Sequence, residues 1–429
     1  MRKLILFCSL LTLCIPIFGQ HSTVDSLEQL LEQTKADTTR LRLLDEIANL
    51  IYQSDFPKTI TYSTEALSLA QKLGDAKHEM RAHYFLGVGH LLSSEEAQAV
   101  YHVEKALEIA ENKLLDQNGM MDCHNLLGNI YKKMNDVDKA LFHLFESAKI
   151  AETYDNQDRL ATTYSNIGQV YMENGEIQKA KSYYSKALAI FLAEKDLFYA
   201  AFLYNNLSEI TESPDSSIVL LNKALEIFEK EQYLDGLGHV SNNLGTEYRK
   251  LGDYQKALPN LERARQIFED ESHYYKPGLV SVYMNLGIVY GAFGDRAAAV
   301  SWFEKSISLA KEIDHKTFLK DAYEQYAHLL ETNNNPQEAL VYFKLAAEVK
   351  DSLFNESKAK ELAESETRYQ TELKEKELTQ KELELEKQSR QKYRILLGGI
   401  IVVLLLISVF LFLRYRLQLR RQQAELNLQ

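Results

Sequence analysis

Asparagine is the residue whose spacing in this chain points most directly to chemistry. Four asparagines recur at intervals of about forty residues, each two positions before a Gly or Ser, and three more lie in the same neighbourhood. They are Asn166, Asn206, Asn243 and Asn285, with Asn129, Asn205 and Asn242 beside them. A side-chain amide has donors and an acceptor, so a row of amides can hold the backbone of an extended peptide. The alternative is that each Asn bonds the backbone of the adjacent unit and is structural, and the pattern leaves both interpretations open.

No residue pattern in the chain predicts catalysis or metal binding. The histidines at 78, 83, 90 and 102 do not form a His-x-x-Glu-His or His-Glu-x-x-His motif, so we expect surface or packing residues. The sequence has no phosphate-cradling glycine loop, no Gly-x-Ser-x-Gly elbow and no Cys/His dyad. We therefore expect a binding protein, not an enzyme, with no cofactor and no metal.

Two helices of a hairpin would position each of these asparagines. Around Asn166, the residues Tyr164, Ile167, Gly168 and Tyr171 fall three and four apart and share one helical face. The sequence Asn174-Gly175-Glu176 then predicts a turn, because Asn and Gly accept the left-handed conformation that ends a helix. Apolar residues from Ala180 onward predict a second helix packed antiparallel on the first.

The hairpin pattern repeats through most of the chain. Its signature is Leu-Gly-x-x-Tyr followed by an Ala, as in Leu127-Gly128, Tyr131 and Ala140. Eight units can be anchored, 37 to 42 residues apart, at Ala48, Gly87, Gly128, Gly168, Ser208, Gly245, Gly287 and Ala327. A stack of such units builds an extended surface and not a deep pocket.

These residues resemble the tetratricopeptide repeat, although the standard unit is shorter, at about 34 residues. The resemblance covers roughly residues 25 to 350 and implies an all-α solenoid of about eight helix-turn-helix repeats, which we assign to residues 20–353. It also implies that the first helices line a concave groove for a peptide or protein ligand. Peptide-binding members such as kinesin light chain have a similar row of asparagines.

Two apolar segments predict export and membrane anchoring. Residues 1–19 begin with Arg2 and Lys3, continue with an apolar run and end at Gly19, which is typical of a signal peptide. Residues 395–413 are uncharged and, as a helix, would be about 28 Å long, enough to span a bilayer. The sequence therefore predicts a single-pass inner-membrane protein with periplasmic repeats and a basic cytoplasmic tail at 414–429.

A charged connector joins the repeats to the predicted membrane helix. Residues 354–394 lack Gly and Pro and contain Glu-to-Lys or Glu-to-Arg pairs four apart, such as Glu356 with Lys360. This composition predicts one long helix. Its apolar residues keep a sevenfold spacing only in part, so both a dimeric coiled coil and a lone helix remain open.

The connector also resembles a Bacteroidetes family of membrane sensors. The residues that carry this resemblance are Asp351–Glu356, Lys358, Glu361, Ala363, Glu364, Thr367, Tyr369, Thr371 and Glu372. Members have exported tetratricopeptide repeats, one membrane helix and a cytoplasmic histidine kinase or helix-turn-helix domain. Only residues 414–429 follow the membrane segment here, and no His follows His328. The chain is therefore either a truncated sensor or a complete protein that signals through a partner.

The charge of the chain narrows the choice of ligand. The net charge is −12, and both ends are basic, so the repeats carry the excess of negative charge. An acidic solenoid repels nucleic acid, which we exclude as a partner. We expect a peptide-binding or protein-binding sensor or scaffold in signal transduction, or alternatively a structural adaptor of an envelope complex.

Overall fold

The computed structural model describes residues 17–52, 54–270 and 274–426, and its regular structure is helical throughout, with no strand in these ranges. The chain divides into two compact units, Met1–Phe343 and Lys344–Gln429, which we treat separately. Most of the predicted signal peptide, residues 1–16, lies outside the described residues. The all-α repeat solenoid predicted from the sequence is confirmed in the first unit.

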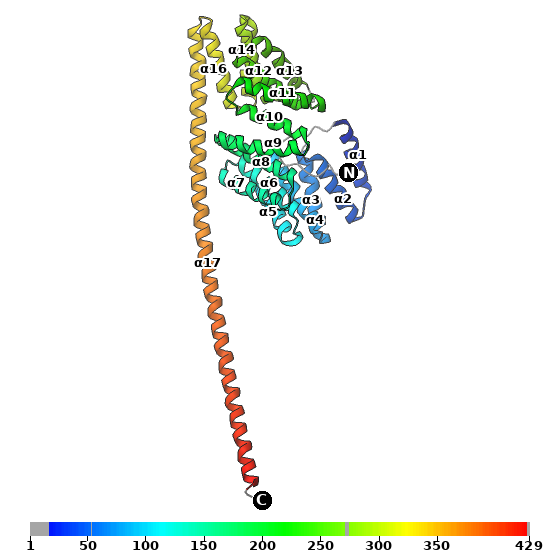
Figure 1. Cartoon of the computed structure of the whole chain (residues 1–429), viewed down its shortest axis with the longest axis vertical. Helices are drawn as coiled ribbons and strands as arrows, with labels where there is room; N and C mark the ends of the chain where they lie inside the picture. The colour runs from blue at the N-terminus through cyan, green and yellow to red at the C-terminus, as the bar shows by residue number, and fades with distance from the viewer. Residues whose placement is uncertain (1–16, 53, 271–273, 427–429) are drawn as a thin grey trace. The chain divides into compact units, whose positions relative to one another are not determined.

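Paired helices follow one another along the first unit (Figure 1). The elements are α1 (Ile17–Gln33), α2 (Asp37–Ile51), α3 (Phe56–Leu73), α4 (Ala76–Leu92), α5 (Glu96–Ile109), the π-helical turn η1 (Ala110–Leu114), α6 (Gln117–Lys133), α7 (Val137–Thr153), α8 (Gln157–Glu173), α9 (Ile177–Ala193), α10 (Leu197–Glu209), α11 (Pro214–Glu231), α12 (Leu234–Lys250), α13 (Tyr254–Glu269), α14 (Lys276–Ala292), α15 (Arg296–Glu312), α16 (Lys316–Thr332) and α17 (Pro336–Leu426). The eight anchor residues lie one each in α2, α4, α6, α8, α10, α12, α14 and α16, the first helices of successive hairpins.

The turns inside the hairpins follow the predicted chemistry. The second residue after the first helix takes a positive φ, as at Asn135 (63°) and Gly175 (77°), so the chain reverses where Asn or Gly tolerates this conformation. The second helix then starts on a capping side chain: the carboxylate of Asp136 accepts the Lys139 N–H at 3.1 Å.

Five of the eight hairpins close where the first helix has a glycine at its anchor position. A Cβ on Gly168 would lie 2.6 Å from the ring of Tyr184, and one on Gly128 would lie 2.5 Å from Leu144 Cγ. The second-helix alanines Ala140 and Ala180 are fully buried at the same interfaces. The two helices therefore approach so closely that the first leaves no room for a side chain at this level.

The second helix of one hairpin packs on the first helix of the next, and several first helices also contact each other. Direct contacts join α2 to α4, α4 to α6, α6 to α8, α12 to α14 and α14 to α16. The first helices thus lie closer together than the second helices, which places them on the concave side of the stack. We call the surface that these first helices share the inner face.

The second unit consists of the later part of α17. This helix continues through 354–394 and through the predicted membrane segment 395–413. The side chains of residues 394–403 lie outside those that the structure describes, as do most of those between 357 and 388. In the described part of the chain, no helix combines the length and apolar character needed to cross a membrane.

Candidate functional site

Two of the predicted asparagines meet a carboxylate at the centre of the inner face. The Asn243 amide on α12 donates to Asn205 Oδ1 at 3.0 Å and to Glu209 Oε1 at 3.3 Å. The Asn205 amide donates to the same Glu209 oxygen at 3.1 Å. Both asparagines are partly exposed and Glu209 is exposed, so this cluster is open to a ligand.

The concave surroundings change the electrostatics of this cluster. Desolvation raises the pKa of the Glu209 carboxyl, although the amides of Asn243 and Asn205 act in the opposite direction. Two amides thus hold the Glu209 carboxyl in place. It makes no ion pair with the residues that the structure describes.

Asn166 occupies a different environment from the central cluster. Its amide donates to Asn125 Oδ1 at 2.8 Å, which joins α8 to α6, and its side chain is only 2% exposed. The partner is thus a side chain of the neighbouring first helix. Asn125 lies three residues before Gly128, the position that Asn205 and Asn242 hold in their own units, but the sequence analysis did not single it out.

Asn285 and Asn242 form a similar link between α14 and α12. The Asn285 amide donates to Thr246 Oγ1 at 3.0 Å and to Asn242 Oδ1 at 3.4 Å, and the Asn242 amide donates to Ser281 Oγ at 3.3 Å. Asn285 is buried, and its Oδ1 has no hydrogen-bond partner in the described structure. Buried acceptors of this kind are rare in folded proteins.

The two remaining predicted residues differ in exposure. Asn129 on α6 is buried, whereas Asn206 on α10 is half-buried and its side chain makes no hydrogen bond to the described residues. The seven asparagines therefore fall into two sets. Asn129, Asn166 and Asn285 are buried, and Asn205, Asn206, Asn242 and Asn243 are accessible to solvent.

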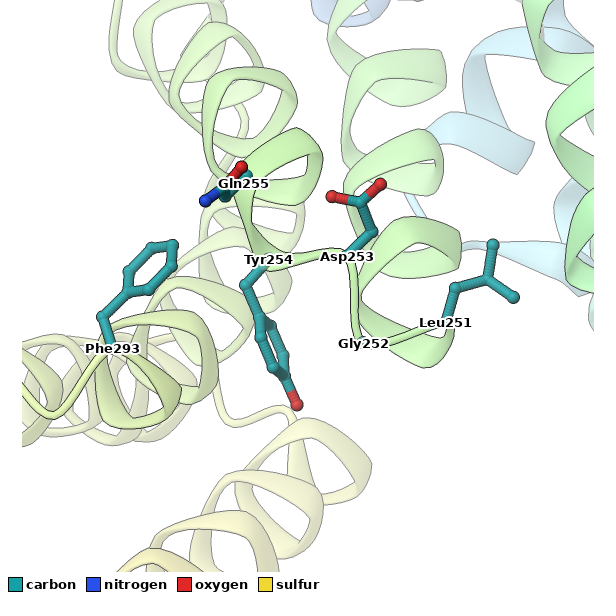
Figure 2. A pocket seen from close by; sticks show the side chains of 6 residues that line it. All are labelled: Leu251, Gly252, Asp253, Tyr254, Gln255 and Phe293. Atoms are coloured by element: carbon teal, nitrogen blue, oxygen red, sulfur yellow. The ribbon is translucent and has the colours of Figure 1, made fainter.

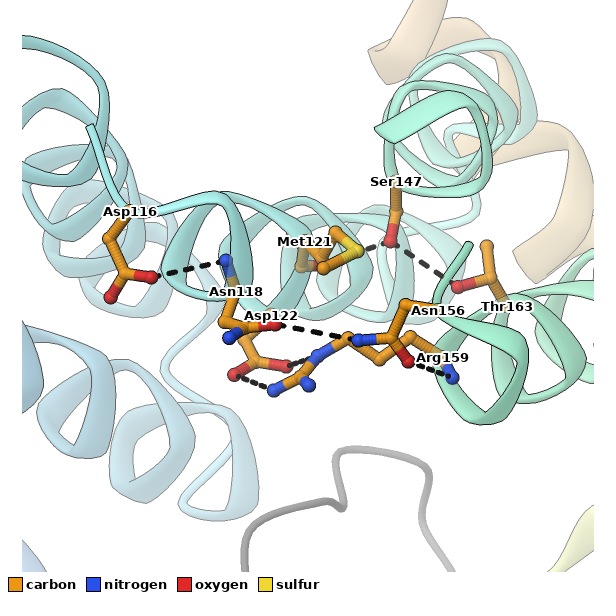
Figure 3. A network of polar contacts seen from close by, with 8 residues as sticks. All are labelled: Asp116, Asn118, Met121, Asp122, Ser147, Asn156, Arg159 and Thr163. Carbon is orange, nitrogen blue, oxygen red and sulfur yellow. Dashed lines mark hydrogen bonds and ion pairs between the residues drawn. The ribbon is translucent and has the colours of Figure 1, made fainter. Parts of the chain in front are cut away.

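A charged bridge between α6 and α8 was not predicted (Figure 3). Arg159 Nε lies 2.9 Å from Asp122 Oδ1, and Arg159 Nη2 lies 2.8 Å from Asp122 Oδ2, which makes a two-pronged ion pair. The Arg159 side chain is 9% exposed and that of Asp122 is 32% exposed. Because the partners are 37 residues apart, only the stacking of two repeats brings them together.

A shallow pocket of about 440 Å³ lies at the turn between α12 and α13 (Figure 2). It is lined by Leu251, Gly252, Asp253, Tyr254, Gln255 and Phe293. The rings of Tyr254 and Phe293 meet edge to face, 6.3 Å apart. None of the seven predicted asparagines lines this pocket, so it is separate from the predicted binding surface.

Three histidines that the sequence analysis treated as scattered come together in the second hairpin. His83 Nδ1 and His102 Nδ1 are 2.9 Å apart, and the His90 ring stacks on that of His102 with centroids 5.4 Å apart. The sequence analysis missed this cluster because the spacing of the three histidines has a meaning only when the two helices of the hairpin pack together. In the described ranges, no group of three or more His, Cys, Asp or Glu side chains is placed to hold a metal ion.

Comparison with known sequences gives a family match over the central hairpins. The Tetratricopeptide repeat model matches residues 119–193, 159–230, 199–270 and 236–312 in overlapping copies. The uncharacterized protein ycf37 of Guillardia theta is 30% identical over 128 residues, which cover 30% of this chain and 67% of that protein. Several other curated relatives are matched over less than half of their own length.

Solved structures share the solenoid fold. Aspartyl phosphate phosphatase F from Bacillus subtilis has a TM-score of 0.57 at 15% identity, over 79% of this chain and 96% of that one. The Rap conjugation gene regulator of the plasmid pLS20, in complex with the Phr* peptide, has a TM-score of 0.54 at 12% identity, over 80% of this chain and 97% of that one. At such low identity, these similarities establish the fold alone.

Proposed function

Because the chain belongs to the tetratricopeptide-repeat family, we propose that it binds an extended peptide or protein segment along its inner face. The observation that carries the proposal is the cluster of Asn205, Asn243 and Glu209, which presents amides from two neighbouring repeats in a solvent-accessible position. Such groups suit the alternating donors and acceptors of a peptide backbone. The relative solved with the Phr* peptide has the same fold, which makes a peptide ligand a reasonable one to test.

The two sets of asparagines would have different roles. Asn205, Asn206, Asn242 and Asn243 are accessible and would contact the ligand. Asn166 and Asn285 are buried and hydrogen-bonded across the repeats, so they would hold the first helices in register. This division keeps both interpretations of the asparagine row but assigns them to different residues.

The test uses peptides selected from a random-peptide phage library on the full chain in detergent micelles. Synthetic copies are titrated calorimetrically into the wild-type protein and into the double variant Asn206→Ala/Asn243→Ala. Loss of two backbone hydrogen bonds of about 1 kcal/mol each predicts at least about tenfold weaker binding. The matched control is Asn222→Ala, because Asn222 lies on second helix α11, is exposed and bonds only the Ile218 carbonyl. Equal affinity in all three proteins would remove the inner face as the site.

We further propose that the protein is a single-pass inner-membrane sensor or scaffold, with the repeats in the periplasm and residues 414–429 in the cytoplasm. The support is sequence-based: the signal-peptide pattern at 1–19, the uncharged run 395–413 and the connector 354–394, which resembles that of Bacteroidetes sensors. A homodimer through the connector belongs to the same proposal. Protease added to intact spheroplasts should digest the repeats. Repeats that are protected from the protease would contradict the proposed topology.

A structural adaptor of an envelope complex is the alternative function. An adaptor and a sensor place different demands on the segment 395–413. An adaptor needs only a tether, so replacing the segment by an unrelated membrane helix should leave it functional. A sensor that transmits a change along the connector should lose its response.

A further inference from the structure

Several hairpins place rings at the same three positions, which we call the ring seam. In the fourth hairpin these are Tyr164 and Tyr171 on first helix α8 and Tyr183 on second helix α9. The Tyr183 ring lies 5.6 Å from each of the other two and is stacked on Tyr171 at 22°. The seventh hairpin also has rings at these positions, but there it is Tyr283, at the position of Tyr164, that stacks on Trp302, at 5.4 Å. The ring seam thus joins the two helices of one hairpin through flat apolar contacts.

The second hairpin keeps the geometry of the seam but replaces every ring by imidazole. His83, His90 and His102 have the spacing of Tyr164, Tyr171 and Tyr183. The His83 and His102 rings lie 5.2 Å apart, and His90 stacks on His102 at 5.4 Å and 5°. The third hairpin is intermediate: His124 lies 5.3 Å from His143, and Tyr131 stacks on His143 at 5.5 Å and 3°.

Imidazole adds a hydrogen bond to the seam that tyrosine does not make there. The Nδ1 atoms of His83 and His102 are 2.9 Å apart, and those of His124 and His143 are 3.0 Å apart. One Nδ1 of each pair must carry a proton and the other must accept it. The bond therefore exists only while at least one ring of each pair is neutral, and protonating both rings puts two donors and two positive charges in contact.

The charged groups around the two imidazole pairs include some that raise and some that lower the pKa of the histidines. The positive side chains of Lys105 on α5, Lys113 on η1 and Lys139 on α7 oppose protonation, as does His90 for His102. The carboxylates of Glu79 on α4 and Glu146 on α7 favour it. Burial outweighs these carboxylates and, together with the neighbouring imidazoles, lowers the pKa of His102 and of His143 to about 4.

We propose that the imidazole pairs of the second and third hairpins form an acid-sensitive joint in the solenoid. At mildly acidic pH the second proton enters each pair, the Nδ1–Nδ1 bond breaks, and α4 loosens from α5 and α6 from α7. The fourth hairpin, with tyrosines at these positions, stays closed. The second and third hairpins therefore loosen on acidification while the fourth hairpin does not.

The experiment is hydrogen–deuterium exchange of the full chain in detergent micelles at pH 7 and pH 5, corrected for the intrinsic exchange rate. For an imidazole with pKa 6.5 when released and about 4 in the seam, the opening equilibrium rises about twentyfold between these pH values. We expect this loss of protection in α4–α7 relative to α8–α9. Unchanged relative protection would overturn the proposal, and so would an equal loss in α8–α9.

Two single variants assign the effect to its residues. His102→Tyr and His143→Tyr each install the ring found at the same position of the fourth hairpin, Tyr183. His102→Tyr should reduce the acid response of α4 and α5 only, and His143→Tyr that of α6 and α7 only, because His83 and His124 stay buried. Each variant keeps the other seam as an internal control, so misfolding would show as lost protection at both pH values. An acid response of undiminished size in both variants would assign it to other groups.

Discussion

The inner face and the ring seam hold the same solenoid together in different ways. Across the inner face, neighbouring hairpins are joined by polar contacts between specific partners, such as Arg159 with Asp122 and Asn166 with Asn125. In the ring seam, the two helices of one hairpin are joined by stacked rings, and tyrosine, tryptophan and histidine all occur with similar geometry. A polar pair fixes one register, because a buried polar group without its partner is costly, whereas stacked rings tolerate substitution. Contacts between repeats should therefore be more sensitive to mutation than contacts inside the ring seam.

The largest expected effect comes from breaking the ion pair of the inner face. Asp122→Ala leaves the Arg159 guanidinium, whose side chain is 9% exposed, without its carboxylate and should cost about 3 kcal/mol. The measurement is urea denaturation of the full chain followed by circular dichroism. The matched control is Glu229→Ala, which removes an ion pair of 2.7 Å with Arg263 between the outer helices α11 and α13.

The control pair also joins neighbouring repeats, but both of its side chains are more than a third exposed. Exposed ion pairs contribute little, so the control should cost less than about 1 kcal/mol. Equal costs for Asp122→Ala and Glu229→Ala would mean that the inner face is no more specific than the outer surface. The comparison between the two regions would then fail.

The sequence predicts the hairpins well because their determinants are local. The spacing of Gly168, Tyr171 and Ala180 and the turn residue Gly175 lie within one unit, so periodicity and turn chemistry identify them. The partners of the asparagines could not be predicted in this way. Asn125 and Asn166 are 41 residues apart, and whether they meet depends on the angle between successive hairpins, which no local pattern specifies. The histidine pairs were missed because the motifs considered lie within one helix, whereas His83 and His102 meet across two.

A second prediction concerns volume in the closely packed part of a hairpin. Gly168→Ala places a methyl group 2.6 Å from the Tyr184 ring, which is fully buried, so α8 and α9 must move apart at a cost of about 1 to 2 kcal/mol. Gly175→Ala tests the turn of the same hairpin, where nothing lies near the new methyl group and the cost arises from a φ of 77°. We expect about 1 kcal/mol for this backbone effect.

Urea denaturation of both glycine variants sharpens the comparison. A cost for Gly168→Ala below that of Gly175→Ala would show that the helix interface adapts to extra volume. Tolerance of substitution would then extend from the ring seam to the whole interface between α8 and α9. If Gly168→Ala costs more than Gly175→Ala, as expected, tolerance is confined to exchanges of one flat ring for another of similar volume at the same position.

The smallest expected effect is Tyr131→His, which turns the ring seam of the third hairpin into that of the second. At pH 7.5 the new imidazole can stack on His143 as His90 stacks on His102, so the loss should be no more than about 0.5 kcal/mol. Part of that loss is the contact of Lys139 with the Tyr131 ring, 5.0 Å from its centroid. The second hairpin also bonds His90 to Glu95 at 2.6 Å, whereas the third has Asp136 at the equivalent position, already occupied in capping α7. The opposite exchange in the second hairpin, His90→Tyr, should therefore lose that bond as well and destabilise the protein more. A larger loss of stability in Tyr131→His than in His90→Tyr would mean that the ring seam depends on the identity of its rings.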